Sequence, residues 1–243
     1  MRAISAVFLL VVAALWGCAP GPTLPADEEQ LERLYQRAIV DAESLGTSAI
    51  RPLTPISPEV EFLAWEGAPG ESRVLLVNWT DDAPAEAGAS TQIGETWVTL
   101  APKVQDFCTA LSGDAGEVSM RLRQAIGLPP DAPYDLFVSL WVDPEDVFRP
   151  CRDPQITDRD CPLTFPRSER FVTVADEHVD WIEGNIDFSY QPDGYPWTNL
   201  GYTYDWGNPE DIFGFSEYVI RAGADVTVEA IDSTETYCGV DDP

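Results

Sequence analysis

The feature that most constrains the fold is the segment YDLFVSLWVDP, residues 134–144. Its apolar residues follow one another almost without interruption, whereas a strand with one face in water alternates apolar and polar side chains. A run of this kind is typical of a strand that is buried on both faces. The sequence therefore predicts a central strand here, with other elements packed on both sides of the sheet.

Helices and further strands are predicted around this segment from the spacing of apolar residues. Helical spacing runs through residues 27–45, 102–113 and 116–127. Strands are predicted at residues 60–67, 72–80, 95–102, 170–175, 215–223 and 224–232. We expect the last two to form a hairpin that turns near Gly223, and residues 175–190 allow either a helix or a strand. Without strict β-α-β alternation, this mixture predicts one α+β domain with a mixed or antiparallel sheet and about three helices.

Four cysteines lie beyond the N-terminal region, at positions 108, 151, 161 and 238. An even number of cysteines in an exported chain suggests two disulfides, although four cysteines allow three pairings. Because Cys151 and Cys161 bracket a short polar loop, we favour that pair, which leaves Cys108 with Cys238. The competing interpretation is a zinc site of four thiolates, and the lack of any C-x-x-C spacing disfavours it.

The N-terminus predicts export. Arg2 precedes an apolar run over residues 3–15, which is shorter than the ~20 residues that span a bilayer and has the layout of a secretory signal. The run ends in Leu15-Trp16-Gly17-Cys18, which resembles the lipobox of bacterial lipoproteins, although that family usually has a smaller residue in place of Trp16. The resemblance implies that Cys18 becomes the first mature residue and carries the lipid, palmitate included. The alternative is an ordinary signal peptide, cut near Ala19 or Gly21.

The resemblance also implies an organisation and a location. We expect a signal peptide (1–17), a proline-rich lipidated tether (18–26), an N-terminal helix (27–45) and a globular domain (46–243). In enteric-type bacteria an aspartate after the cysteine resembles a signal for retention at the inner membrane. Because Ala19 stands there, we expect a protein of the cell outer membrane and periplasm, attached to the membrane through its lipid.

The charge of the chain excludes some partners. Its 42 acidic residues outnumber its 14 basic ones and give a formal charge of −28. Nucleic acid and anionic lipid surfaces are therefore disfavoured, because phosphate binding needs clustered cations. We favour solubility or a salty habitat as the reason for the acidity, and cation binding is the functional alternative. A glycan or another envelope protein is the partner class that we retain.

Familiar catalytic motifs are absent from the sequence. There is no G-x-S-x-G, H-E-x-x-H, G-x-x-x-x-G-K-[ST] or G-x-G-x-x-G pattern. The single histidine, His178, excludes a histidine-rich metal site. Because His178 lies among acidic neighbours, we expect it at the surface with a raised pKa.

Calcium is the one cofactor that the sequence suggests, and the expectation is weak. The polar loop between Cys151 and Cys161 contains Asp153, Asp158 and Asp160, whose oxygens suit a hard cation. The spacing is not that of an EF-hand. We favour a salt-bridged loop in which nearby arginines neutralise these acids.

The segment YPWTNLGYTYDWG, residues 195–207, concentrates aromatic side chains. Pro196 and Gly201 indicate two short extended pieces around a turn at residues 199–201. The rings that could bind a ligand are Tyr195, Trp197, Tyr202, Tyr204 and Trp206. Burial in the core and display on a binding face both remain open for these rings.

Carboxylates are the only abundant reactive groups. Asp205, inside the aromatic segment, and Glu217 are the candidates for catalysis, since a suitably spaced pair could cleave glycosides. The segment around Glu217 resembles the last catalytic strand of ADP-ribosyltransferases, although Phe215 stands where the toxin branch has a second acid.

The sequence thus favours a cell-envelope lipoprotein that acts as a binding or structural module without catalysis. The rival is an exported hydrolase or transferase that uses carboxylates, directed at glycans. An enzyme should place two acids in one concave pocket among aromatic rings. A binding module should instead show a shallow aromatic face and scattered acids.

Overall fold

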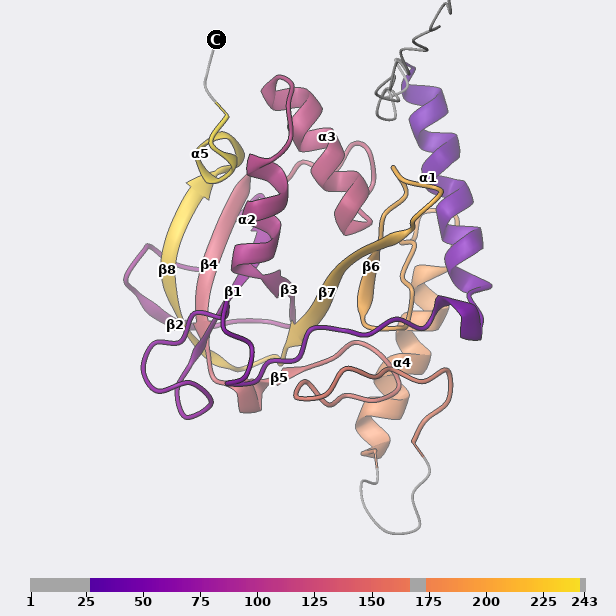
Figure 1. The fold of residues 1–243 in the computed structure, drawn as a ribbon. Coiled ribbons are helices and arrows are strands. Elements are labelled where there is room, and N and C mark those ends of the chain that lie inside the picture. Colours follow the sequence, from indigo (N-terminus) through magenta and orange to yellow (C-terminus); the bar gives the residue numbers. More distant parts are fainter. Residues whose placement is uncertain (1–26, 167–173, 241–243) are drawn as a thin grey trace, which may run out of the picture.

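The computed structural model describes residues 27–166 and 174–240, which form an α+β fold around one antiparallel sheet (Figure 1). The predicted fold class is confirmed. The segment of residues 134–144 forms β4 (Leu136–Val142), which lies between β8 (Asp225–Ser233) and β1 (Val74–Thr80). The described residues contain five α-helices, more than the three expected.

The sheet has eight strands in the order β2-β8-β4-β1-β3-β7-β5, with β6 paired to β7. The remaining strands are β2 (Ser90–Gln92), β3 (Thr96–Leu100), β5 (Val147–Phe148), β6 (Tyr202–Tyr204) and β7 (Phe213–Ile220). The described residues also contain two short 3-10 helices, η1 (Thr47–Ala49) and η2 (Pro144–Asp146).

The sheet curls because β2 leads almost directly into β3 while the two pair with different strands. The first half of this segment pairs with β8, and the second half pairs with β7 and β1. An irregularity in the β4–β8 pairing between Ser139 and Leu140 lies in the middle of the sheet, where a bulge increases the bend. Alternate side chains such as Val74, Val138 and Val228 fill the inside of the curl.

The other face of the sheet is covered by helices. Helices α2 (Ala101–Thr109), α3 (Ala115–Ile126) and α5 (Thr234–Cys238) lie together on one part of it (Figure 1). Their apolar side chains pack with Val77, Trp79 and Phe137, which point away from the inside of the curl. Helix α3 ends where the sequence predicts, because Gly127 adopts the left-handed conformation at φ 79°.

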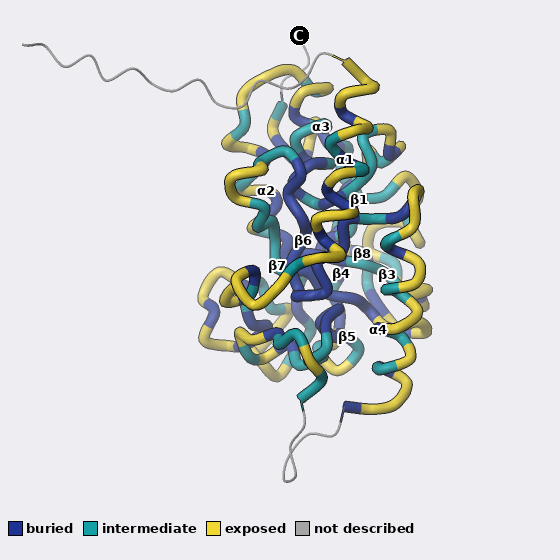
Figure 2. The backbone as a smooth tube through the Cα atoms, turned by 90° about the vertical axis from the view of Figure 1, so that its right-hand side faces the viewer, coloured by how far each residue is buried: buried dark blue, intermediate teal, exposed yellow. Residues whose placement is uncertain are grey.

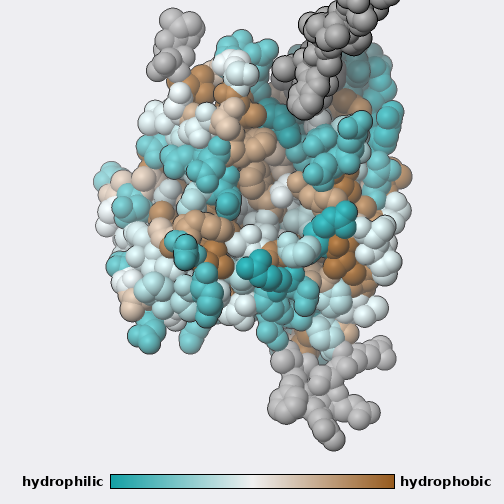
Figure 3. All heavy atoms as spheres, viewed as in Figure 1, coloured by the Kyte–Doolittle hydropathy of each residue, from teal (hydrophilic) through white to brown (hydrophobic). Residues whose placement is uncertain are grey.

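Two longer helices flank the sheet, α1 (Glu28–Glu43) and α4 (Asp176–Ser189). Asp27 caps α1 by accepting the N–H of Glu29. The apolar side of α1 packs on the aromatic segment, where the Tyr35 ring contacts Trp206 and its hydroxyl donates to the carbonyl of Gly194 at 2.9 Å. Figure 2 shows buried residues gathered along the strands and the exposed residues on the outer sides of helices and loops. On the face seen in Figure 3, hydrophilic and hydrophobic residues are interspersed.

Both disulfides join the pairs that the sequence favours. One links Cys151 to Cys161, and the other links Cys108 on α2 to Cys238 on α5. Within the residues that the structure describes, no helix has the length and apolar character needed to cross a bilayer.

Three predicted elements differ from the structure or lie outside it. Residues 60–67 form turns and a single antiparallel bridge from Trp65 to Val74 instead of a continuous strand, and Val60 and Leu63 belong to the inner core. The strands at 215–223 and 224–232 exist as β7 and β8, but the hairpin is wrong. The Ile93 backbone bonds to Gly223 and Ala224 at the turn, so that the β2–β3 segment separates the two strands. The strand predicted at 170–175 lies largely outside the described residues.

Candidate functional site

A pocket of about 500 Å³ lies over the outer face of the sheet. Its floor follows from strand register, since Val77 on β1 pairs with Thr99 on β3, and Thr99 pairs with Glu217 on β7. Residues paired directly across neighbouring strands point to the same face of a sheet. The register therefore brings Glu217, from a strand late in the chain, beside residues of two early strands.

Eight aromatic side chains contribute to the pocket wall. They come from β1, β3, β4, β6, α4 and the segments that lead into β4 and β6. The rings are Trp79, Trp97, Tyr134, Phe137, Phe188, Tyr195, Trp197 and Tyr204. Phe188 is 61% exposed and lies with Tyr195, whose ring centre is 6.0 Å away, at the outer edge of the pocket.

Two polar atoms of the pocket are buried without a partner. Glu217 is 7% exposed and Trp197 is 5% exposed. Among the described residues, no group hydrogen-bonds Glu217 Oε1 or Trp197 Nε1. Their neighbour Thr203 is satisfied, because its hydroxyl donates to the Ala125 carbonyl and accepts the N–H of Phe215. The lack of a hydrogen-bond partner thus concerns Glu217 and Trp197 and does not extend to Thr203.

Burial raises the pKa of Glu217 to about 8. The cause is desolvation, which penalises the charged form of a carboxyl group. Glu217 is therefore largely protonated at neutral pH and can donate a hydrogen bond as an acid or accept one through its free oxygen. A cation placed beside it would favour the ionised form.

The candidate rings of the aromatic segment divide between pocket and core. Tyr195, Trp197 and Tyr204 line the pocket, whereas Tyr202 packs near the loop disulfide and Trp206 packs against α1. All except Tyr195 are buried. The predicted turn is present, with positive φ at Asn199 and Gly201. The rings therefore form a concave wall in place of a flat exposed face.

Asp205 does not line the pocket with Glu217. Its carboxylate receives two hydrogen bonds from Arg121, at 2.8 and 2.5 Å, and one from the N–H of Gly207 at 3.1 Å. The side chains of Asp205 and Arg121 are 7% and 21% exposed, so that this ion pair is partly withdrawn from water. The structure thus does not bring together the two acids that the sequence suggests as a catalytic pair. The acid that shares the pocket with Glu217 is Glu95.

The likeness to an ADP-ribosyltransferase strand does not extend to the local geometry. Glu217 lies in the middle of β7, and β7 does not continue into a paired hairpin with β8.

His178 is not a surface residue, which corrects the prediction. It is 8% exposed on α4, its ring packs on Trp181 and Phe148, and its Nε2 lies 2.8 Å from the carbonyl oxygen of Cys151. Burial lowers the pKa of His178, and this effect outweighs the bond to the carbonyl, which raises it. The acidic neighbours in sequence do not set this pKa because the ring points away from them into the protein.

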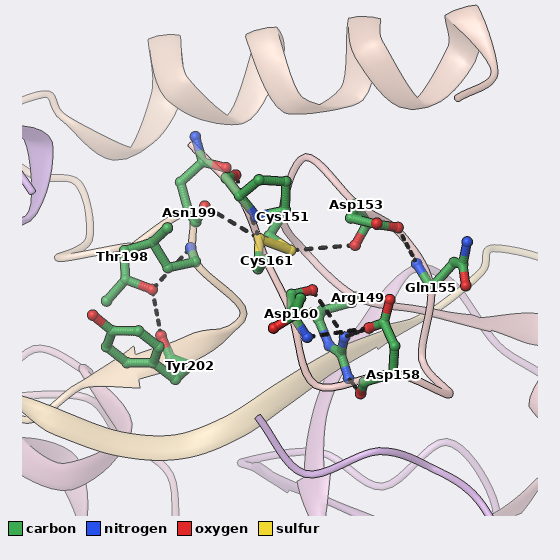
Figure 4. Close-up of a disulfide and its surroundings, with 12 residues drawn as sticks. Arg149, Cys151, Asp153, Gln155, Asp158, Asp160, Cys161, Thr198, Asn199 and Tyr202 are labelled. Atoms are coloured by element: carbon green, nitrogen blue, oxygen red, sulfur yellow. Dashed lines mark hydrogen bonds and ion pairs between the residues drawn. A yellow bond between two sulfur atoms is a disulfide. The ribbon is translucent and has the colours of Figure 1, made fainter. Parts of the chain in front are cut away.

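The loop between Cys151 and Cys161, for which the sequence suggests calcium, contacts the side chain of Arg149 (Figure 4). Arg149 is fully buried, donates to the Asp158 carboxylate at 2.7 Å and reaches the carbonyl oxygens of Asp158 and Asp160 at 2.9 and 3.4 Å. Asp153 instead accepts the N–H of Gln155. Over residues 27–166 and 174–240, no three His, Cys, Asp or Glu side chains are arranged to hold a metal ion.

Sequence reasoning named Glu217, Tyr195, Trp197 and Tyr204 but missed the rest of the pocket. The missing wall includes Trp97 and Thr99, whose alternation along one strand is visible in the sequence. That alternation shows which residues share a face but not which strand lies beside them. No protein-family model, curated protein or solved structure matches this chain.

Proposed function

We propose that this protein is a binding module of the cell envelope that holds a small ligand in the pocket above Glu217. A lipid on Cys18 would attach it to the outer membrane, and the proline-rich tether after that residue would separate the domain from the bilayer. Two disulfides are consistent with export.

One observation carries the proposal: the unpaired atoms of Glu217 and Trp197 both belong to side chains that line an aromatic pocket. A buried polar group without a partner costs about 1–3 kcal/mol. Ligand pockets combine apolar walls with a few polar groups that fix orientation. A ligand that bonds to both groups would recover this cost on binding.

A carboxylate-dependent hydrolase is the second candidate, because Glu217 and Glu95 share the pocket with aromatic rings. A protonated Glu217 could act as a general acid. Glu95, however, is exposed, and its carboxylate accepts the Trp181 indole N–H at 2.7 Å. Trp181 lies outside the pocket lining, so this bond engages the Glu95 carboxylate away from Glu217, and we favour binding.

The test uses an uncharged apolar dye, N-phenyl-1-naphthylamine, with the exported chain made soluble by Cys18→Ser. The dye should bind saturably with increased fluorescence. Asn185→Trp on α4 adds a ring to the pocket lining and should weaken binding at least tenfold. The control is Glu183→Trp, on the same helix but exposed and outside the lining. A dye that does not bind, or that binds both variants equally, would refute the proposed function.

A further inference from the structure

Among the described residues, the pocket lining contains two carboxyl groups and no basic group. They are Glu217 on the floor and Glu95 on the exposed side, and none of the described lining residues is lysine, arginine or histidine. The guanidinium of Arg123 lies 5.6 Å from the Trp79 ring centre but is outside the lining. The whole chain, at −28, adds a field of the same sign. The pocket thus attracts positive charge and disfavours anions.

The rings provide the second feature that cations need. Trp97 and Trp197 make an edge-to-face contact in the lining, with ring centres 6.2 Å apart and planes at 89°. Indole faces attract cations by their quadrupole, with about 0.5–2 kcal/mol for each contact. Aromatic side chains can hold a quaternary ammonium group in this way without hydrogen bonds.

We infer that the ligand of this pocket is an organic cation, with an ammonium group against Glu217 and an oxygen atom that accepts the Trp197 indole N–H. The inference rests on the proposed function and specifies its ligand class. The ammonium would supply the positive counter-charge that the ionised carboxylate of Glu217 lacks. The oxygen would satisfy the second unpaired atom, which a cation alone leaves without a partner.

The rival ligand is a neutral hydroxylated molecule such as a sugar, which could also bond to both atoms. It would use the protonated form of Glu217, whereas a cation uses the ionised form. The two classes therefore respond oppositely to a change of Glu217 to a neutral residue and to a rise in pH. The all-acidic lining favours the cation, since a sugar gains nothing from the excess of negative charge.

Choline and 3,3-dimethylbutan-1-ol form a matched pair of probes. They have the same shape and hydroxyl group, and differ in that a charged nitrogen replaces a carbon atom. Binding is measured by tryptophan fluorescence and by displacement of the neutral dye, with glucose as the sugar probe. Choline should bind at least tenfold more tightly than its neutral analogue, and Glu217→Gln should remove that preference. The exposed Glu210→Gln serves as the matched control.

The pH dependence of the unsubstituted domain provides a second measurement that does not depend on a variant folding. With the pKa of Glu217 at about 8, the ionised fraction rises about tenfold between pH 7 and pH 9. Choline affinity should rise by the same factor, and the affinity of the neutral alcohol should stay level.

Several titratable neighbours of Glu217 keep their protonation state between pH 7 and pH 9. Tyr190, after α4, and Tyr202, on β6, lie close enough to feel its charge, and burial raises the pKa of both well beyond the ordinary value. Burial also raises the pKa of the lining residues Tyr134 and Tyr204. Glu95 is the other acid of the lining. His178, beyond Trp181, has a lowered pKa and stays neutral between pH 7 and pH 9.

The outcomes separate the inference from the proposed function. Equal affinity for the two matched probes, or a preference for glucose, while the dye still binds, would refute the cationic ligand and leave the binding module standing. Failure of choline to bind while the dye binds would also refute the cationic ligand. Failure of every probe, the dye included, would refute both.

Discussion

The substitution Glu217→Gln should stabilise the domain at alkaline pH, by an amount that grows as the pH rises. Burial raises the pKa of Glu217 from 4.5 to about 8. Between these values the folded domain keeps a proton that the unfolded chain releases, so the stability of the folded state falls with increasing pH. Below pH 4.5 both states are protonated, and the contribution of Glu217 is then constant.

The size of this effect follows from the width of the pH window. Each pH unit within it costs about 1.4 kcal/mol of unfolding free energy, so that the full loss approaches about 5 kcal/mol above pH 8. Water that enters the pocket and solvates the carboxylate would reduce this value. Glutamine keeps the shape of the side chain and does not ionise. The variant and the unsubstituted domain should therefore differ least near pH 5 and most near pH 9.

The measurement is urea unfolding at several values between pH 5 and pH 9, followed by tryptophan fluorescence and circular dichroism. The relevant quantity is the difference in unfolding free energy between the two proteins, because titrations common to both, such as that of His178, then cancel. Glu210→Gln removes an exposed acid and should give a nearly constant difference. A Glu217→Gln difference that stays constant with pH, or shrinks as the pH rises, would refute the buried-acid reasoning.

Three further changes test other parts of the chain. Replacing Cys108 and Cys238 by alanine opens a cross-link between residues 130 apart and should lower the unfolding free energy by about 5 kcal/mol in urea; a loss below about 1 kcal/mol would contradict the expected constraint on the unfolded chain. Asp205→Asn should cost about 3 kcal/mol, because it leaves the Arg121 guanidinium without its buried counter-ion, and adding Arg121→Met should restore part of the loss. If the double variant is as unstable as the sum of both single changes, the ion pair is not the cause. Cys18→Ser should move the protein from the detergent phase to the soluble exported fraction, and unchanged partitioning would contradict the lipid anchor.

Helices α1, α2 and α3 were predictable because their signals are local. Asp114 and Glu117 form a reciprocal capping box at the start of α3, and Gly127 ends the helix. These residues lie within one or two turns of the bonds that they make, so the sequence contains the whole interaction. Helix α4 was ambiguous because its buried side includes His178 and Ser189 as well as Ile182, which weakens the apolar period.

Strand pairing was less predictable because it depends on distant partners. The turn after β7 has the residues of a hairpin, with Gly223 at φ 85°. The backbone of Ile93, far earlier in the chain, takes the hydrogen bonds at this turn and keeps the two strands apart. A local pattern cannot show that competitor. The pocket was not predictable for the same reason, because Thr99 and Glu217 lie side by side only through the register of β3 and β7.

Asp205 and Glu217 show why the candidate site needed the structure. Both are acids close to the aromatic segment, and both are less than one-tenth exposed. Asp205 has a complete set of partners, two bonds from Arg121 and one from a backbone N–H, which explains its presence by stability alone. Substituting Asp205 should therefore lower the unfolding free energy by more than the roughly 1 kcal/mol of a single local hydrogen bond.

Glu217 presents the opposite case. Valine or threonine would fit a buried position opposite Thr99 without an ionisable group, and stability alone would favour such a residue. Instead an acid lies there, with an unpaired oxygen in a pocket whose other unpaired atom is the Trp197 N–H. Natural proteins depart from local stability mainly at functional sites. Because Asp205 is paired and Glu217 is not, Glu217 is the acid that we assign to the functional site. Its ligand should carry a positive charge.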